Sequence, residues 1–344
     1  MKKLLLIAVL FTAVFASCKK HQDPSAPTPT AKDIYAAGIE SNGTKNVAQY
    51  WKNGTATNLS DGNQNAVARY IVVAGTDVYV AGFEFKAAGK NVPKYWKNGT
   101  ATDLSDGNQN AAALSIVVAG TDVYAAGYEG NAAGKNVAKY WKNGTATNLS
   151  DGNQNAGALD IVVAGADVYV AGYEFNAAGK NVAKYWKNGT ATNLSDGTNS
   201  AIIQSIVVAG ADVYAAGYEL NAAGKAVAKV WKNGTATSLS DGNQHAFALP
   251  IAVAGADVHV AGYELNAAGK SIAKYWKNGT ATNLSNGTQD ANALSIVVAG
   301  TDVYVAGYEN NGAKNVAKYW KNGVATNIVT GAALSSEAYS IFIK

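Results

Sequence analysis

Two acidic residues recur along this sequence, and positioned carboxylates are common groups for acid–base chemistry. One is a glutamate with a lysine six residues later, as Lys90 follows Glu84, which predicts an exposed ion pair within a loop. The other is an aspartate, such as Asp77 or Asp122, which we expect to bond the backbone of its own turn. Neither set predicts a catalytic pair. The repeated glutamates are Glu84, Glu129, Glu174, Glu219, Glu264 and Glu309.

Metal binding is the second chemistry to consider, because repeated Ser-Asp-Gly-Asn-Gln-Asn segments are rich in oxygen ligands. If Gly62 took the sixth place of a calcium loop, Thr57 and Leu59 would take the first and third, and leucine cannot coordinate a cation. A weak calcium site is therefore the less favoured interpretation. The single cysteine and three scattered histidines do not form a zinc pattern. We expect no metal and no cofactor.

Composition and motifs narrow the class of function. The 28 basic residues exceed the 24 acidic ones by a charge of +4 that forms no basic block, so we expect no nucleic-acid partner. Nucleophile-elbow, phosphate-loop and HExxH motifs do not occur, so we expect a protein that is not an enzyme. The 36 glycines and 19 tyrosines, with many valines, predict a β-rich fold.

Seven tryptophans mark an internal repeat. They recur at a spacing of 45 residues, with 44 for the last interval: Trp51, Trp96, Trp141, Trp186, Trp231, Trp276 and Trp320. Each unit contains four runs of β-forming residues separated by Gly, Asn and Asp, and the Asn-Gly pair after each tryptophan favours a type I′ hairpin turn. In one unit the predicted strands are 113–119, 122–129, 136–142 and 145–150. The strands are apolar on both faces, which is typical of small sheets packed between neighbours.

About 45 residues and four strands per unit are typical of a propeller blade. The Ile-Val-Val-Ala-Gly-Thr-Asp-Val-Tyr-Val-Ala-Gly stretch resembles the first hairpin of NHL-type blades, and the tryptophan resembles that of the WD and Kelch repeats. The repeat pattern thus predicts that residues 33–344 form an all-β, seven-bladed β-propeller of four-stranded blades, which we expect to be a monomer. Because residue 33 begins a second strand and 339–343 form an inner strand, the C-terminal strand should pair with the N-terminal blade and close the ring.

The strand order predicts two different faces. The turns after the first and third strands are tight, and the longer Glu-x-Asn-Ala-Ala-Gly-Lys and Ser-Asp-Gly-Asn-Gln-Asn loops share the opposite face, where a binding surface is expected. The tryptophans could stack on sugar rings, but burial between blades is the stronger interpretation.

Differences between the repeats supply the candidate ligand-binding residues. Large apolar residues at the predicted loops and replacements of a recurrent leucine are the most distinctive changes: Phe85, Phe175, Phe247, Arg69 and Gln204. One interpretation is a recognition surface for a glycan or an envelope or extracellular protein; the other is drift at exposed loops. The proposed role is a binding or scaffolding module, and the alternative is an envelope hydrolase or lyase on the same scaffold.

The N-terminus predicts export. Residues 1–17 have the order of a secretory signal, with two lysines before an apolar run that is too short to span a bilayer. Phe15-Ala16-Ser17-Cys18 resembles the lipobox of bacterial lipoproteins, which implies lipidation of Cys18; an ordinary signal peptide is the alternative. Residues 18–32 continue as a Pro-, Ser-, Thr- and Ala-rich tether. We expect a protein of the bacterial cell envelope, such as the outer membrane, held by its lipid anchor only.

Overall fold

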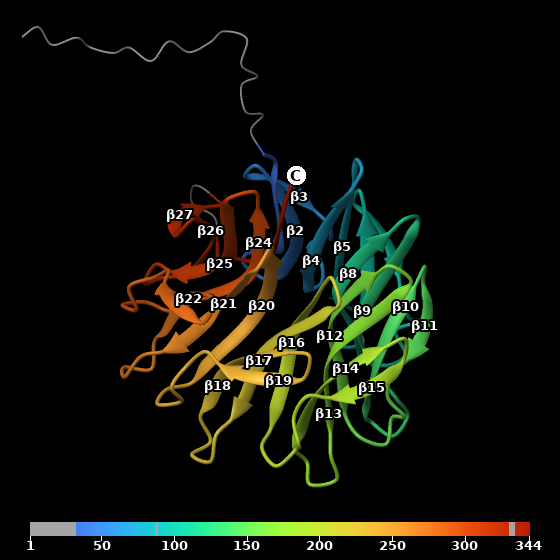
Figure 1. Cartoon of the computed structure of the whole chain (residues 1–344). Helices are drawn as coiled ribbons and strands as arrows, with labels where there is room; N and C mark the ends of the chain where they lie inside the picture. Colours follow the sequence, from blue (N-terminus) through green and yellow to red (C-terminus); the bar gives the residue numbers. More distant parts are fainter. Residues whose placement is uncertain (1–31, 87–88, 330–333) are drawn as a thin grey trace, which may run out of the picture. The chain divides into compact units, whose positions relative to one another are not determined.

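A computed structural model describes residues 32–86, 89–329 and 334–344, and the folded unit spans residues 33–344. The folded unit is a ring of seven four-stranded antiparallel sheets, or blades, as predicted (Figure 1). The first blade contains β1, and blades two to seven follow in chain order. Within the described residues, no helix has the length and apolarity needed to cross a bilayer.

The blades repeat one strand order from the axis outward. The inner strands, blade one first, are β28 (Ser336–Ile343), β4 (Ala66–Ala74), β8 (Ala111–Ala119), β12 (Ala156–Ala164), β16 (Ala201–Ala209), β20 (Ala246–Ala254) and β24 (Ala291–Ala299). The second strands are β1 (Ile34–Ser41), β5 (Asp77–Phe85), β9 (Asp122–Gly130), β13 (Asp167–Phe175), β17 (Asp212–Leu220), β21 (Asp257–Leu265) and β25 (Asp302–Asn310). The third strands are β2 (Asn46–Lys52), β6 (Asn91–Lys97), β10 (Asn136–Lys142), β14 (Asn181–Lys187), β18 (Ala226–Lys232), β22 (Ser271–Lys277) and β26 (Asn315–Lys321). The outer strands are β3 (Thr55–Asn58), β7 (Thr100–Asp103), β11 (Thr145–Asn148), β15 (Thr190–Asn193), β19 (Thr235–Ser238), β23 (Thr280–Asn283) and β27 (Val324–Asn327).

The tight turns share one end of the ring, which we call the short-turn face. Asn98 and Gly99 both have positive φ, 50° and 85°, as the predicted type I′ turn requires. Asp77 does not bond its own turn as predicted: its Oδ1 accepts from Asn98 Nδ2 at 2.8 Å, and its Oδ2 pairs with Lys97 Nζ at 2.8 Å. The aspartate thus ties the two tight turns of a blade together, and the hydrogen bond from Lys97 is the main cause of its lowered pKa.

The longer loops share the opposite end, the long-loop face. In the third blade, Asn131 Nδ2 donates to the carbonyl of Gly152 at 2.9 Å and so joins the loops 131–135 and 151–155. The glutamate of each second strand does not pair with the loop lysine predicted from sequence. Glu129 instead pairs with Lys139 Nζ at 2.6 Å, because antiparallel pairing of β9 with β10 brings these side chains together.

Seven bulges set the direction of side chains at the axis. In each inner strand the register shifts near its middle, as between Ala113 and Ser115, so Leu114 is the extra residue. The shift presses the carbonyl oxygen of Ala112 against Gly127, where a Cβ would lie 1.8 Å from that oxygen. Only glycine fits this approach, so the recurrent Ala-Gly of the second strand accommodates the bulge.

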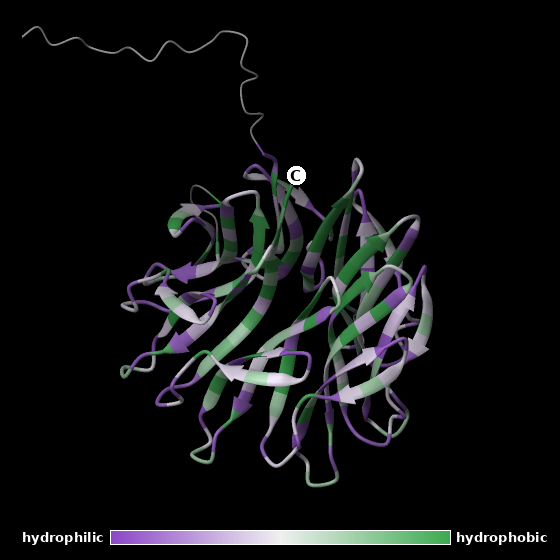
Figure 2. Ribbon diagram, viewed as in Figure 1, coloured by the Kyte–Doolittle hydropathy of each residue, from purple (hydrophilic) through white to green (hydrophobic). Residues whose placement is uncertain are grey.

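The core lies between the blades. All seven tryptophans are about 1% exposed, which contradicts the sugar-stacking interpretation and confirms packing between blades. Trp96 of the second blade packs in a cluster with Tyr35 and Ala37 of the first. Figure 2 shows the corresponding hydrophobic colouring along the inner strands and hydrophilic colouring at many loops.

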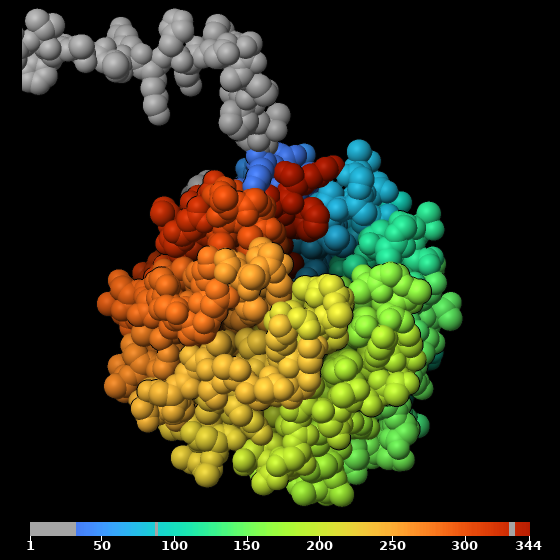
Figure 3. Space-filling model, in the orientation of Figure 1, coloured from blue at the N-terminus to red at the C-terminus, as the bar shows by residue number. Residues whose placement is uncertain are grey.

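The ring closes as predicted, by pairing of the C-terminal strand with the N-terminal blade. The last strand, β28, pairs antiparallel with β1, and Asp33 and Lys344 exchange two backbone hydrogen bonds of 2.9 Å. Trp51 and Ile341 of the first blade pack with Tyr304 of the seventh, so the seam has the same kind of core as the other junctions. Figure 3 shows the two ends of the folded unit, blue and red, side by side in the ring.

Candidate functional site: the central channel

The inner strands enclose a channel with two halves of different character. The half nearer the short-turn face is a cavity of about 360 Å³, lined mainly by Ile and Val side chains such as Val117 and Val207. The half nearer the long-loop face is a cavity of about 280 Å³ that also contains charged and hydroxyl groups. Because polar groups in a concavity orient ligands, the second half is the candidate site.

The bulge residues line this polar half. Their side chains come from one position of each blade: Tyr339, Arg69, Leu114, Leu159, Gln204, Leu249 and Leu294. Arg69 and Gln204, both predicted from sequence as ligand-binding residues, therefore lie in the same cavity. We call Arg69, Tyr70, Gln204, Tyr308, Glu337 and Tyr339 the channel site.

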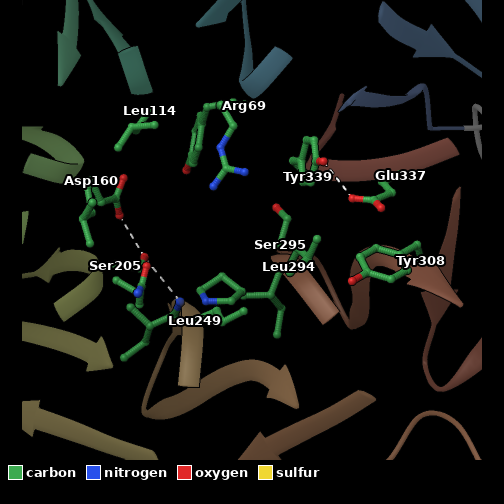
Figure 4. Close-up of a pocket in the computed structure, with 16 residues that line it drawn as sticks. Arg69, Leu114, Asp160, Ser205, Leu249, Leu294, Ser295, Tyr308, Glu337 and Tyr339 are labelled. Atoms are coloured by element: carbon green, nitrogen blue, oxygen red, sulfur yellow. Dashed lines mark hydrogen bonds between the residues drawn. The ribbon is translucent and has the colours of Figure 1, made fainter. Parts of the chain in front are cut away.

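Arg69 is the only arginine of the chain, and its side chain projects into the channel (Figure 4). Its Cζ lies 4.8 Å from the centroid of the Tyr339 ring, a cation–π contact. The side chain keeps exposed surface in the open space of the channel, although surrounding protein lowers the pKa of its guanidinium. Within the described residues, Arg69 makes no hydrogen bond and no ion pair, so its donors are available to a ligand.

Glu337 lies on the far side of the Tyr339 hydroxyl from this cation. Tyr339 donates to Glu337 Oε2 at 2.7 Å, and Asn315 Nδ2 donates to Oε1 at 2.6 Å. Burial, and then the charge of Glu337, raise the pKa of Tyr339 well above its usual range, so its phenol stays protonated at neutral pH. Tyr339 is therefore a fixed donor and an aromatic surface, and a phenolate nucleophile is not favoured.

Asp160 has a structural role in the same channel. It is only 5% exposed, and its Oδ1 accepts from Ser115 Oγ at 2.7 Å and from the amide of Ile161 at 2.9 Å. Its Oδ2 accepts from Ser205 Oγ at 2.8 Å and from the amide of Ile206 at 3.0 Å. Burial raises the pKa of this carboxyl, and its four donors come from three consecutive blades, so Asp160 links those blades.

A tyrosine recurs at one position of the second strand, and in the seventh blade this tyrosine, Tyr308, lines the channel site. One tyrosine comes from the second strand of each of blades three to seven: Tyr128, Tyr173, Tyr218, Tyr263 and Tyr308. Burial raises the pKa of all five, so their hydroxyls remain protonated donors at neutral pH. Of these five tyrosines, only Tyr308 has a partner for its hydroxyl within the described chain: Asn292 Nδ2 donates to it at 2.6 Å.

The three phenylalanines predicted to bind a ligand do not line the channel site. Phe85 is the last residue of β5, and its ring centroid lies 5.9 Å from that of Phe83. Phe175 is the last residue of β13, and its ring centroid lies 6.0 Å from that of Tyr173. Phe247 belongs to β20, with its ring 4.9 Å from both Tyr218 and Tyr263. All three are half-buried strand residues and not loop residues, because the strands extend further than the repeat pattern predicts.

The remaining titratable groups do not form a metal centre in the part of the chain that the structure describes. His245 Nδ1 accepts from the amide of Ala226 at 3.1 Å, and His259 Nδ1 lies 2.6 Å from Tyr275 Oη. His245 thus links the loop after β19 to β18, and His259 contacts a residue of its own blade. Cys18, predicted to be lipidated, lies outside the described residues.

Sequence reasoning did not select Tyr70, Asp160, Tyr308, Glu337 or Tyr339. Three of them depart from the residue that recurs at their inner-strand position: Tyr70 and Asp160 replace a serine, and Tyr339 replaces a leucine. A comparison of the repeats along the whole inner strand, with the single arginine as a marker, is the signal that could have found them.

Comparisons with known proteins bear on the fold. No protein-family model matches the chain, and no curated protein matches it. Among solved structures it is similar to that of a puromycin-hydrolyzing peptidase of Mycobacterium tuberculosis, with a TM-score of 0.58 and 11% identity over 86% of this chain and 52% of that chain. The chain thus spans about half the length of the peptidase chain, and at this identity the likeness is one of fold alone.

Proposed function

We propose that this protein is a binding module of the bacterial cell envelope that admits a group of a glycan or an extracellular protein into the polar half of its central channel. The observation that carries the proposal is the set of unpartnered polar groups there. The side chains of Arg69, Tyr70 and Gln204 make no hydrogen bond with any residue in the described ranges 32–86, 89–329 and 334–344.

The fold itself does not need these groups. Leucine takes the place of Arg69 and Gln204 in four blades, and serine takes the place of Tyr70 in four blades. A guanidinium without a partner costs stability in a partly enclosed site, where leucine would not. Their presence on one level of one cavity is therefore better explained by a ligand than by folding.

Asp33, where the folded unit begins, lies at the short-turn face, where it pairs with Lys52 Nζ at 2.8 Å and accepts from Asn53 Nδ2 at 2.7 Å. The channel site lies toward the opposite, long-loop face.

The second candidate function is a hydrolase or lyase of the envelope. It is favoured by one observation: residues found in single blades, such as Arg69, Glu337 and Tyr339, gather near the axis. Binding is the better supported function because the carboxylate of Asp160 already accepts four hydrogen bonds and Tyr339 holds its proton. A hydrolytic pair would need a free base beside an activated nucleophile.

The test uses a glycan and envelope-protein array with the full chain and two variants. Arg69→Leu with Gln204→Leu restores the recurrent leucines, and we expect it to lose the wild-type signals while keeping the same melting temperature or a higher one. Lys97→Gln on the short-turn face is the control, and we expect it to bind as the wild type does. Equal binding by all three proteins would contradict the channel as the binding site, and turnover of an array ligand would favour the enzyme.

A further inference from the structure

The channel site carries a more specific assignment, which rests on the proposed function. We infer that the group admitted to the channel is a sugar acid, free or at the end of a glycan, with its carboxylate held by the guanidinium of Arg69. The argument rests on the chemistry of Arg69, the groups that surround it and the size of the cavity.

The guanidinium of Arg69 is suited to bind a carboxylate, and no carboxylate of the described residues pairs with it. A guanidinium presents paired N–H donors that match the two oxygens of a carboxylate. Glu337 does not form an ion pair with it, because this carboxylate is bound by Tyr339 Oη and Asn315 Nδ2. Asp160 is likewise occupied by serine hydroxyls and backbone amides. The described chain therefore leaves the charge of Arg69 without a countercharge in direct contact.

The groups around Arg69 suit hydroxyl groups in addition to a carboxylate. The amide of Gln204 both donates and accepts, and the hydroxyl of Tyr70 has no partner in the described residues. Glu337 retains acceptor capacity, since a carboxylate has about four lone-pair sites and two hydrogen bonds are in use. A ligand with one carboxylate and several hydroxyls would use this whole set, whereas a simple anion would use only Arg69.

The shape of the cavity favours one small ring over a protein surface. Its volume of about 280 Å³ lies just below the range of pockets that hold drug-sized ligands, about 300–1,000 Å³. The rings of Tyr308 and Tyr339 line the cavity, and the flat apolar faces of such rings suit the faces of a sugar ring. A folded protein could insert only a side chain or a chain end, which would leave Gln204 and Tyr70 unused.

The single arginine makes a direct measurement possible. In the full chain labelled with ¹⁵N-arginine, the only side-chain Nε–Hε signal reports Arg69. The probes are glucuronate, its methyl ester, glucose, glucosamine, acetate and a tetrapeptide with a free C-terminal carboxylate. We expect glucuronate to shift this signal saturably, and its neutral ester and glucose to bind at least tenfold more weakly.

Variants test the role of the guanidinium by calorimetry with glucuronate. Loss of charge-assisted hydrogen bonds worth about 1.5–3 kcal/mol corresponds to an affinity roughly ten- to hundredfold lower for Arg69→Leu. Arg69→Lys keeps the charge but not the paired donors, so we expect an intermediate affinity. Lys97→Gln, on the other face, should bind as the wild type does.

The outcomes separate this inference from the proposed function. No saturable shift with glucuronate, equal binding of glucose or acetate, tighter binding of glucosamine or the tetrapeptide, or unchanged binding by Arg69→Leu would each overturn the sugar-acid assignment. If an array ligand without a carboxylate still requires Arg69 and Gln204, the channel remains the site and only the ligand class is wrong. If no array ligand is affected by the double leucine variant, the proposed function itself fails.

Discussion

The guanidinium of Arg69 faces the ring of Tyr339 at 4.8 Å across the junction between the second blade and the first, which the C-terminal strand completes. Arg69 belongs to β4, the inner strand of the second blade, and Tyr339 to β28, which the C-terminus contributes to the first. The ring closure therefore completes the channel site as well as the fold. A change that opens the junction is expected to impair both stability and binding.

Deletion of residues 338–344 tests this relationship. It removes most of β28, exposes the edge of β1 and takes away buried Ile341, so we expect a loss of several kcal/mol, since one fully buried aliphatic side chain contributes about 1.5–3 kcal/mol. Thermal unfolding and gel filtration measure the effect. Lys344→Ala, which removes one hydrogen bond to the carbonyl of Gly75, is the matched control. A truncated protein that is monomeric and as stable as the control would contradict the closure.

Asp160→Ser should change how stability depends on pH. The pKa of Asp160 is raised by burial above its ordinary value of 3.8, so the folded state holds its proton more tightly than the unfolded state. As pH rises from 3.8 to the folded pKa, each pH unit should cost the wild type about 1.4 kcal/mol relative to the serine variant. Serine occurs at this position in four other blades, where Ser340 accepts from the amide of Ile71 at 3.2 Å.

A second carboxylate supplies the control for that experiment. The amide of Thr198 is the main cause of the lowered pKa of Asp196, so its stabilising effect is present above the ordinary pKa and is lost as pH falls. Asp196→Asn should therefore give a difference from the wild type with the opposite dependence on pH. Parallel stability curves for the wild type and Asp160→Ser between pH 4 and 7 would show that Asp160 is not held as described.

Phe247→Ala should destabilise the propeller more than Phe85→Ala. The ring of Phe247 lies 4.9 Å from two tyrosines, and aromatic pairs contribute about 0.5–1.5 kcal/mol each, so we expect a loss of about 1–3 kcal/mol. Phe85 has one aromatic neighbour, at 5.9 Å, so the loss of stability for Phe85→Ala should be about half as large. Chemical denaturation measures both. Equal losses would mean that the Phe247 contacts do not stabilise the blades.

Cys18→Ser should release the protein from the membrane fraction. The prediction rests on the lipobox-like segment Phe15-Ala16-Ser17-Cys18 and on the absence of any other cysteine in the sequence. Cell fractionation followed by immunoblotting compares the variant with the wild type, and Ser17→Ala, beside the cysteine, is the control that should stay bound. Retention of the serine variant in the membrane would exclude the lipid as the anchor.

The repeat pattern was sufficient to predict the blades because local and global preferences agree in each unit. The Asn-Gly pairs adopt the positive φ angles that their turns need, and each tryptophan is buried where the pattern placed it. The phase of the pattern also predicted which strand closes the ring.

The site was predicted only in part, because it depends on the register in which neighbouring strands pair and not on the spacing of residues along the sequence. A bulge decides that Arg69, Gln204 and Tyr339 point into one cavity, and its position follows from a contact between an inner-strand carbonyl and glycines such as Gly82 and Gly127. Strand pairing also decides that Glu129 meets Lys139 and not the loop lysine. Such contacts between strands cannot be read from residue types along one strand.

Protection of a single thiol tests most directly whether the ligand occupies the channel. Because Cys18 is the only cysteine, Cys18→Ser combined with Leu294→Cys carries one thiol in the channel, and Cys18→Ser combined with Ala133→Cys carries one on an exposed long loop. The rate of maleimide labelling is measured for each, with and without glucuronate or the tightest ligand from the array. We predict slower labelling in the channel and an unchanged rate on the loop. Protection of the loop thiol with no protection in the channel would contradict the channel as the binding site.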